Sequence, residues 1–196
     1  MSWAELKERI SGCRDCVVAD CGRPLFMRGD PTGARVLFVM EEPNPDDTIK
    51  HGFITIETSE DETGATFNDF FTSELPPGEV LAVTNSALCL PPRKSGNNPI
   101  TGEQHRNCSR HLRDVIELVK PAIVATLGWE ALDAAGRIER HGLPGVTKCA
   151  GQHVPWFGRT LFPMSHPGGR GSSPVNRSEE LQRGDWRKLG EMLAAL

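Results

Sequence analysis

The segment Val80-Leu-Ala-Val-Thr-Asn-Ser-Ala-Leu-Cys89 determines how the remaining sequence is interpreted. Its first residues are apolar and rich in valine, and the run is too short for a helix, so residues 80–83 are predicted to form a buried strand. Polar residues follow, among them Asn85, and the segment closes on Cys89 before two prolines. We expect Asn85 to point into a ligand pocket beyond the strand and Cys89 to bind a metal.

Three further segments carry a strand signal, and helical patterns separate them. Strands are predicted over residues 36–39, 80–83, 122–127 and 159–163, and helices over residues 2–11, 66–72, 102–120, 129–137 and 178–195. Strands that alternate with helices indicate a parallel sheet. The sequence therefore predicts an α/β fold, a three-layer sandwich with a central four-stranded parallel sheet flanked by helices on both faces. With 196 residues, the chain is predicted to form a single domain over residues 1–196.

Chemically useful residues follow each predicted strand. Glu41 and Glu42 come after the first strand, Asn85 after the second, Gly128 after the third and His166 after the fourth. Ligands of such sheets bind in the crevice beyond the carboxyl ends of the strands. The pattern therefore predicts that carboxylate, amide and imidazole groups meet at one rim. Taken singly, each residue also has a structural interpretation, such as a solvated turn or an asparagine that satisfies loop backbone groups.

Composition and charge exclude several classes of protein. Hydrophobic residues make up 38% of the chain and charged residues 24%, which is ordinary for a globular protein. The net charge of −4 argues against a protein that coats nucleic acid, because its field repels phosphate. No apolar run approaches the ~20 residues of a membrane span. Residues 1–10 have the pattern of an amphipathic charged helix and not of a signal peptide. We expect a cytoplasmic protein that does not bind membranes.

The six cysteines are interpreted through their spacing, because cytoplasmic thiols stay reduced. Cys13-x-x-Cys16 is a chelating pair, and Cys89 and Cys108 supply two more thiols. Four thiolates suit an iron–sulfur cluster or a structural zinc ion. The wide separation of the second pair favours a 4Fe-4S cluster, with zinc as the alternative. Four unrelated cysteines, buried in the core, are the structural alternative.

The order and spacing of these motifs resemble the uracil-DNA glycosylase superfamily, closest to its iron–sulfur branch, the family-4 enzymes. The resemblance covers residues 13 to 167. In chain order its motifs are Cys13-x-x-Cys16, Val36-Leu-Phe-Val-Met-Glu-Glu-Pro43, Thr84-Asn85 with Cys89, Cys108, Lys120-Pro-Ala-Ile-Val-Ala-Thr-Leu-Gly128, and Ser165-His166-Pro167. The resemblance implies a hydrolase that removes uracil, or a related deaminated base, from DNA in base-excision repair. It implies DNA as the partner, and we expect a monomer.

The resemblance also implies catalytic roles. Its first motif places a residue that activates water in the turn after the first strand, where Glu41, Glu42 and Asp47 are the candidates. His166 matches the histidine that stabilises the departing base. Cleavage of an N-glycosidic bond puts positive charge on the sugar and negative charge on the base. A carboxylate can stabilise the positive charge on the sugar, and an imidazole N–H can stabilise the negative charge on the base.

Base-binding and DNA-contacting roles are implied in the same way. Phe53 falls where the family stacks an aromatic ring on the extruded base, and Asn85 matches the residue that reads the edge of uracil. One amide offers a donor and an acceptor together, which matches O4 and N3–H of uracil. Gly168 and Arg170 lie in the segment that enters the duplex groove. The base must leave the stack before it can be cleaved.

This chain departs from the family pattern at several positions, and other functions are compatible with it. Met40 and Asn44 replace glycines of the first motif, and Gly168 replaces a serine after His-Pro. A catalytically weak relative that senses or holds uracil-containing DNA is one alternative. A zinc-stabilised hydrolase of a nucleoside-like small molecule, which uses Glu42 and His166, is the other.

Overall fold

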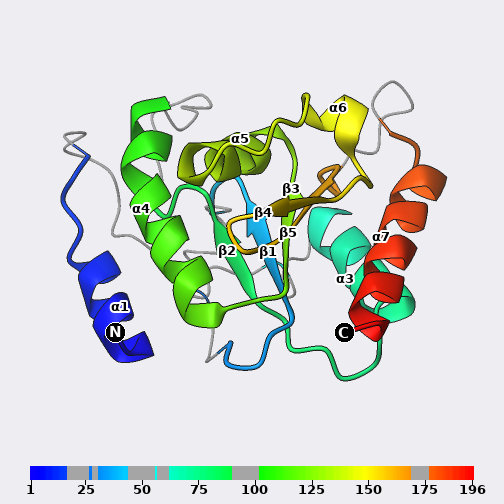
Figure 1. The fold of residues 1–196 in the computed structure, drawn as a ribbon, viewed down its shortest axis with the longest axis horizontal. Coiled ribbons are helices and arrows are strands. Elements are labelled where there is room, and N and C mark those ends of the chain that lie inside the picture. The colour runs from blue at the N-terminus through cyan, green and yellow to red at the C-terminus, as the bar shows by residue number, and fades with distance from the viewer. Residues whose placement is uncertain (17–26, 28–30, 44–55, 57–61, 90–101, 169–176) are drawn as a thin grey trace.

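The computed structural model describes residues 1–16, 27, 31–43, 56, 62–89, 102–168 and 177–196. Helices and strands alternate along the chain (Figure 1). The elements are α1 (Trp3–Ser11), β1 (Val36–Met40), α3 (Glu62–Glu74), β2 (Val83–Asn85), α4 (Gly102–Val119), β3 (Ile123–Leu127), α5 (Trp129–Ile138), α6 (Val146–Cys149), β4 (Val154–Trp156), β5 (Arg159–Met164) and α7 (Glu179–Ala194).

Five strands form one sheet, in the order β2-β1-β3-β5-β4. Strands β2, β1, β3 and β5 run parallel, and β4 pairs with β5 in the antiparallel direction. Strands β1 and β3 are buried along their whole length, as expected of central strands that are covered on both faces. The α/β class and the parallel arrangement of the predicted strands are therefore confirmed.

Two predictions about the strands are wrong. The sheet has five strands and not four, because Val154–Trp156 forms a short edge strand that turns back onto β5. A three-residue edge strand that contains proline carries no alternating pattern that would reveal it. The second strand is Val83–Asn85 and not residues 80–83, because pairing with β1 begins at Val83 and Val80 is 40% exposed.

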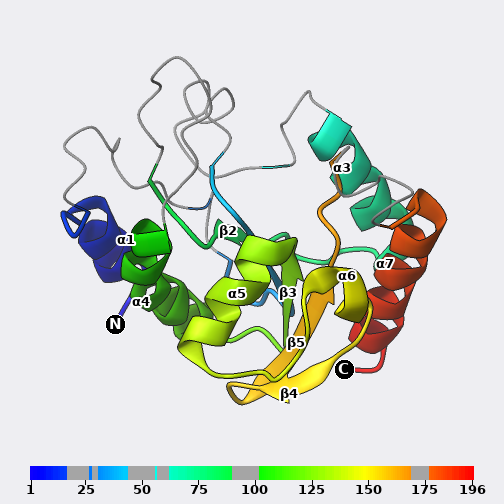
Figure 2. The same ribbon diagram turned by 90° about the horizontal axis from the view of Figure 1, so that it is seen from above.

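Helices lie on both sides of the sheet (Figures 1 and 2). Helices α4 and α5 lie on one side, with α1 beside α4, and α3 and α7 lie together on the other side. The predicted helix 66–72 is part of the longer α3, which begins at Glu62, and the short α6 was not predicted. An acidic residue in the first turn favours this earlier start, because it complements the positive end of the helix dipole.

Four aromatic rings hold α3 and α7 against the sheet. Phe38 of β1 stacks on Trp186 of α7 and meets Phe67 of α3 edge to face, each with ring centroids 5.2 Å apart. Trp186 also contacts Phe70, at 5.8 Å. Such pairs contribute ~0.5–1.5 kcal/mol each beyond their buried area. This packing fixes the first turn of α3, which contains Thr63, relative to the carboxyl end of β1.

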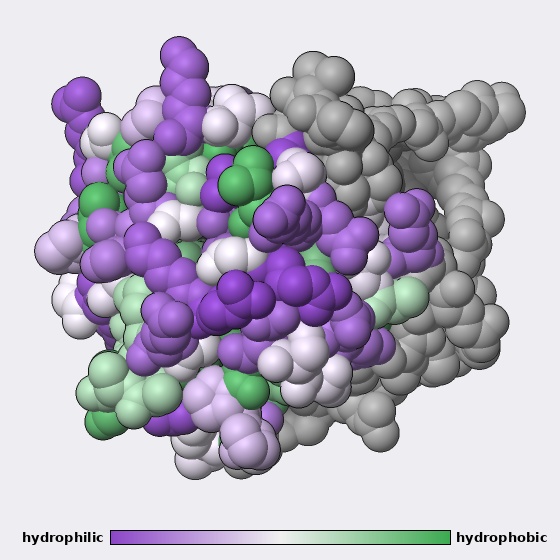
Figure 3. Space-filling view, turned by 90° about the vertical axis from the view of Figure 1, so that its right-hand side faces the viewer, coloured by the Kyte–Doolittle hydropathy of each residue, from purple (hydrophilic) through white to green (hydrophobic). Residues whose placement is uncertain are grey.

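The described surface on the side of α3 and α7 is mainly hydrophilic (Figure 3). Arg183 contributes to it through ion pairs with Asp69 at 2.6 Å and Glu74 at 3.1 Å. Of the helices in the described ranges, none combines the length and the apolar character that a membrane crossing requires.

Candidate active site

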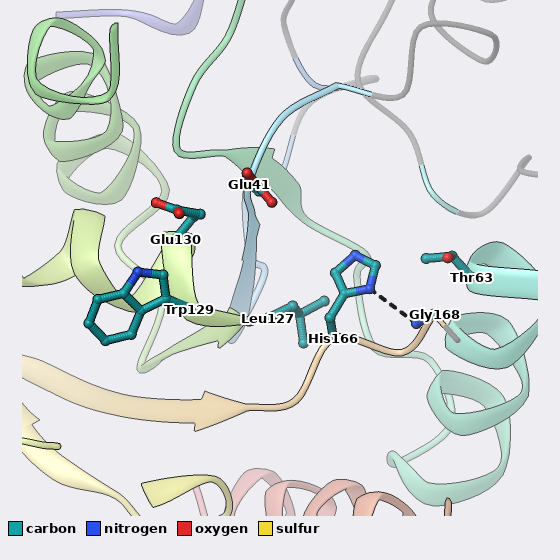
Figure 4. Close-up of a pocket in the computed structure, with 8 residues that line it drawn as sticks. Glu41, Thr63, Leu127, Trp129, Glu130, His166 and Gly168 are labelled. Carbon is teal, nitrogen blue, oxygen red and sulfur yellow. Dashed lines mark hydrogen bonds between the residues drawn. The ribbon is translucent and has the colours of Figure 1, made fainter. Parts of the chain in front are cut away.

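The carboxyl ends of β1, β3 and β5 border a pocket of about 500 Å³ (Figure 4). Each element supplies lining residues: the turn after β1, the first turn of α3, the end of β3, the start of α5 and the segment after β5. The lining residues are Glu41, Thr63, Leu127, Gly128, Trp129, Glu130, His166 and Gly168. The predicted meeting of strand ends therefore brings Glu41, His166 and Gly168 into one pocket.

The position of His166 defines which of its ring nitrogens carries a proton. The backbone N–H of Gly168 donates to Nδ1 of His166 at 3.1 Å. A neutral imidazole that accepts at Nδ1 carries its hydrogen at Nε2. Figure 4 shows the second ring nitrogen directed away from Gly168. The pocket therefore contains a histidine whose Nε2–H is a hydrogen-bond donor.

Gly168 has no room for a side chain. A Cβ at this position would lie 2.3 Å from Thr63 Oγ1 and 3.2 Å from His166 Nδ1. A serine or alanine would push the Thr63 hydroxyl away and crowd the imidazole that accepts the Gly168 N–H. The close approach of α3 thus explains a glycine at this position.

Gly128 joins the ends of β3 and β5 and starts α5. Its φ of 95° lies in the left-handed region that favours glycine, and its N–H donates to the Met164 carbonyl at 2.9 Å. This turn places Trp129 and Glu130 on the pocket wall. It also directs the amino-terminal end of α5, the positive end of its dipole, toward the pocket.

The turn after β1 is tied to the segment after β2. The Glu41 carbonyl accepts the Ala87 N–H at 3.0 Å and the Ser86 hydroxyl at 2.9 Å, and the Ser86 N–H donates to the Met40 carbonyl at 2.7 Å. Glu41 lines the pocket. Glu42 is half-buried and is not among the lining residues.

Asn85 lies beside this turn but does not line the pocket. It is the last residue of β2 and pairs with Met40 of β1. Its side chain is fully buried, and within the described part of the chain neither amide atom has a hydrogen-bond partner. Leaving a buried polar group unpaired costs ~1–3 kcal/mol. Such a cost is expected where an amide is kept for a ligand.

Several pocket residues were not predicted, and three predicted residues lie outside the described ranges. Trp129 and Glu130 follow Gly128 directly, so their place after the third strand was the signal that would have found them. Trp129 is 54% exposed, which is unusual for so large an apolar side chain. Thr63 had no sequence signal, because only the packing of α3 brings it to the pocket. The predicted residues outside the described ranges are Asp47, Phe53 and Arg170.

Three of the four cysteines predicted to bind a metal lie on or beside the amino-terminal half of α4. Cys108 is on the buried face of α4, and Cys13 and Cys16 follow α1. Asn107 Nδ2 donates to Cys16 Sγ at 3.8 Å, and the Arg110 guanidinium donates to Cys13 Sγ at 3.9 Å. The fourth thiol is half-buried after β2, at Cys89.

A second group of possible metal ligands overlaps with these cysteines. One ligand atom from each of Cys13, Asp15 and His111 lies within 4.8 Å of the others. His111 is buried, and neither ring nitrogen has a hydrogen-bond partner in the described ranges. Burial, followed by the charges of Arg110 and Arg9, lowers the pKa of His111 to about 4. A neutral imidazole next to a thiol is chemically suited to hold a metal.

The fold and pocket define an α/β protein with its ligand site at the carboxyl ends of parallel strands. The model of the uracil DNA glycosylase superfamily matches residues 26–190. The match covers more than half of the chain, so the chain belongs to this superfamily. Membership identifies it in general terms as a glycosylase-type enzyme of DNA repair. A comparison with curated proteins finds no match.

Proposed function

We propose that this chain is a monofunctional DNA glycosylase that hydrolyses the N-glycosidic bond of uracil, or of a related deaminated base, in DNA. The observation that carries the proposal is the His166 donor in a pocket that also contains the Glu41 carboxylate. An N–H donor and a carboxylate are the two groups that this bond cleavage requires.

His166 acts on the leaving base. As the glycosidic bond breaks, its electron pair goes to the base, which departs as an anion. The Nε2–H of His166 donates a hydrogen bond to a base oxygen and stabilises this negative charge. Loss of one such donor typically reduces kcat by ~10²–10³-fold. The amino-terminal end of α5 adds a positive potential from the same wall of the pocket.

Glu41 acts on the sugar and on the attacking water. Its carboxylate stabilises the positive charge that develops on the sugar and orients a water toward the anomeric carbon. Of the three predicted carboxylates we assign this role to Glu41, because it lines the pocket. As the new C–O bond forms, water passes a proton to the Glu41 carboxylate, and this proton finally neutralises the base anion. The sugar keeps a hydroxyl where the base was attached.

Base recognition is assigned to Asn85 and to the aromatic residues. The unpaired amide of Asn85 supplies the donor and acceptor that uracil O4 and N3–H require. Extrusion of the base exposes its faces, and aromatic side chains stack on such faces. We assign that role to Phe53 and, at the exposed rim, to Trp129.

We further propose that Cys13, Cys16, Cys89 and Cys108 hold a 4Fe-4S cluster. Its contribution would be structural, since it would cross-link the segment after α1, the segment after β2 and α4. The thiols beside Asn107 and Arg110 support this, because N–H donors stabilise thiolate sulfur. Zinc held by thiolates, with His111 as a further ligand, is the alternative.

Incubation with uracil-containing oligonucleotides, single- and double-stranded, followed by cleavage of abasic sites, tests the proposed function. We expect strand cleavage that depends on uracil, and a loss of ~10²-fold or more in His166→Ala. The matched control is His153→Ala, because His153 is exposed and is not among the residues that line the pocket. Cleavage no greater than that of His166→Ala would overturn the proposal. DNA retention without abasic product would instead indicate a binding protein.

A further inference from the structure

A chain of polar side chains connects two walls of the pocket through the protein interior. Ser86 Oγ lies 2.9 Å from the Glu41 carbonyl oxygen and 3.2 Å from Nδ1 of His105. On the other side of the same ring, Nε2 of His105 lies 3.8 Å from Oε2 of Glu130. Glu41 and Glu130 both line the pocket, so the chain starts and ends at residues that face it (Figure 4).

Burial determines what this chain of side chains does. Serine, histidine and carboxylate in this order form the nucleophilic machinery of many hydrolases. Ser86 is 0% exposed and His105 is 2% exposed, and the Ser86 hydroxyl, unlike the Asn85 amide, is already engaged inside the protein by the Glu41 carbonyl and the His105 ring. The group therefore holds other residues in place and does not attack a substrate.

The hydrogen atoms of the three groups depend on one another. Ser86 has one hydroxyl hydrogen, and it is donated to the Glu41 carbonyl, which can only accept. The Ser86 oxygen then accepts the N–H of His105 from Nδ1, so the neutral ring carries its hydrogen at Nδ1. Nε2 lies 3.8 Å from the Glu130 carboxylate, which is too long for a hydrogen bond, and the two groups attract each other as an ion pair only when the ring is protonated. His105 thereby holds Ser86 against the turn that carries Glu41.

The charges that face His105 come from α5. Burial lowers the pKa of His105 most strongly, Glu130 and Asp133 oppose this effect, and Arg137 adds to it. The neutral ring is thus the form present at neutral pH. In that form Nδ1–H of His105 donates to the Ser86 oxygen, and the Ser86 hydroxyl donates to the Glu41 carbonyl.

We propose that His105 and Ser86 form a positioning relay, in which His105 holds the Ser86 hydroxyl and, through it, the turn that carries Glu41, while Glu130 faces the other ring nitrogen. The relay rests on the proposed function, since it serves the same pocket. It fixes the backbone from which the Glu41 side chain reaches the pocket. The sugar of an extruded nucleotide then meets the Glu41 carboxylate in one position.

Kinetics of three variants and a control test the relay. His105→Phe keeps a buried ring but removes both polar contacts, Ser86→Ala removes the hydroxyl, and the double variant removes both. We expect each single variant to lower kcat about tenfold with KM changed less than about twofold, and the double variant to lower it no further. In a plot of kcat against pH, we expect the acid limb to shift in His105→Phe and to remain at the wild-type position in His153→Gln. His105→Gln, which keeps an N–H donor, recovers part of the rate.

A spectroscopic measurement tests the relay without reference to activity. Nitrogen-15 NMR of the imidazoles is expected to show the Nδ1–H tautomer for His105, with a shift of its ring signals in Ser86→Ala. A wild-type protein without glycosylase activity would overturn the proposed function and leave the relay to be judged on these spectra. The Nε2–H tautomer, or His105 signals that do not respond to Ser86→Ala, would overturn the relay. So would an active enzyme in which His105→Phe and Ser86→Ala both behave like His153→Gln.

Discussion

The surroundings of Asn85 are unfavourable for the stability of the fold. Its amide is fully buried, and both polar atoms are unpaired within the described residues. Thr126 of the nearby strand β3 offers a comparison, because its hydroxyl is also buried and unpaired there. The two residues differ in their place: Asn85 ends its strand beside the Glu41 turn, whereas Thr126 lies within a central strand.

We predict that Asn85→Leu separates stability from function. Leucine has the branching of asparagine without its polar atoms, so the free energy of unfolding is expected to rise by ~1–2 kcal/mol. Discrimination between uracil and cytosine is lost at the same time. Thr126→Val, the matched control, is expected to gain stability and keep discrimination. Urea denaturation and excision assays measure the two effects. An Asn85→Leu protein that is less stable than Thr126→Val and still discriminates would contradict the assignment.

At the scale of elements, the sequence predicted those parts that local pattern determines. Strands β1 and β3 are nearly continuous apolar runs too short for helices, and Glu41 and His166 were found because each lies within two residues of the end of a strand. Strand β4 was missed because a short edge segment has no pattern. The Ser86–His105 contact was missed because it joins residues 19 positions apart, on the segment after β2 and on α4. Such contacts arise from packing and not from local sequence.

Helix α4 is held to α1 and to the segment after α1 by contacts that a metal group would reinforce. Arg110 pairs with Asp15, and Arg9 pairs with Asp114. Asn107 also donates to the Asp15 carbonyl at 3.1 Å. Exposed pairs contribute at most ~1 kcal/mol each. The ion pairs alone are therefore a weak attachment for this segment.

We predict that the purified protein contains iron and acid-labile sulfide and absorbs broadly in the visible range. Cys108→Ser is expected to lose the absorbance and to lower the Tm by ~5–10 °C, since metal binding is coupled to folding. The control is Cys149→Ser, because Cys149 is buried and its thiol donates to the Pro144 carbonyl at 3.2 Å. Elemental analysis and thermal melts provide the measurement. Zinc without sulfide would replace the cluster by the single-ion alternative, and an unchanged Cys108→Ser protein would exclude a metal role for this thiol.

At the scale of the whole molecule, the buried relay makes folding depend on pH. Burial lowers the pKa of His105 in the folded state, whereas the unfolded chain keeps an ordinary histidine pKa of about 6.5. As the pH falls through that ordinary value, His105 becomes protonated in the unfolded state but stays neutral in the folded state. The contribution of His105 to stability is therefore present above pH 6.5 and lost progressively as the pH falls toward its folded-state pKa.

We predict that the wild-type free energy of unfolding falls between pH 7 and pH 5 more steeply than that of His105→Phe. One group changes the slope by at most ~1.4 kcal/mol per pH unit, so the difference between the two curves has this upper limit. Phenylalanine fills the same buried space without a proton site, so the comparison isolates titration from packing even where the variant has a different stability at pH 7. Urea denaturation across this range measures the slopes, and parallel curves for wild type and His105→Phe would mean that the folded state binds the His105 proton as readily as the unfolded chain does.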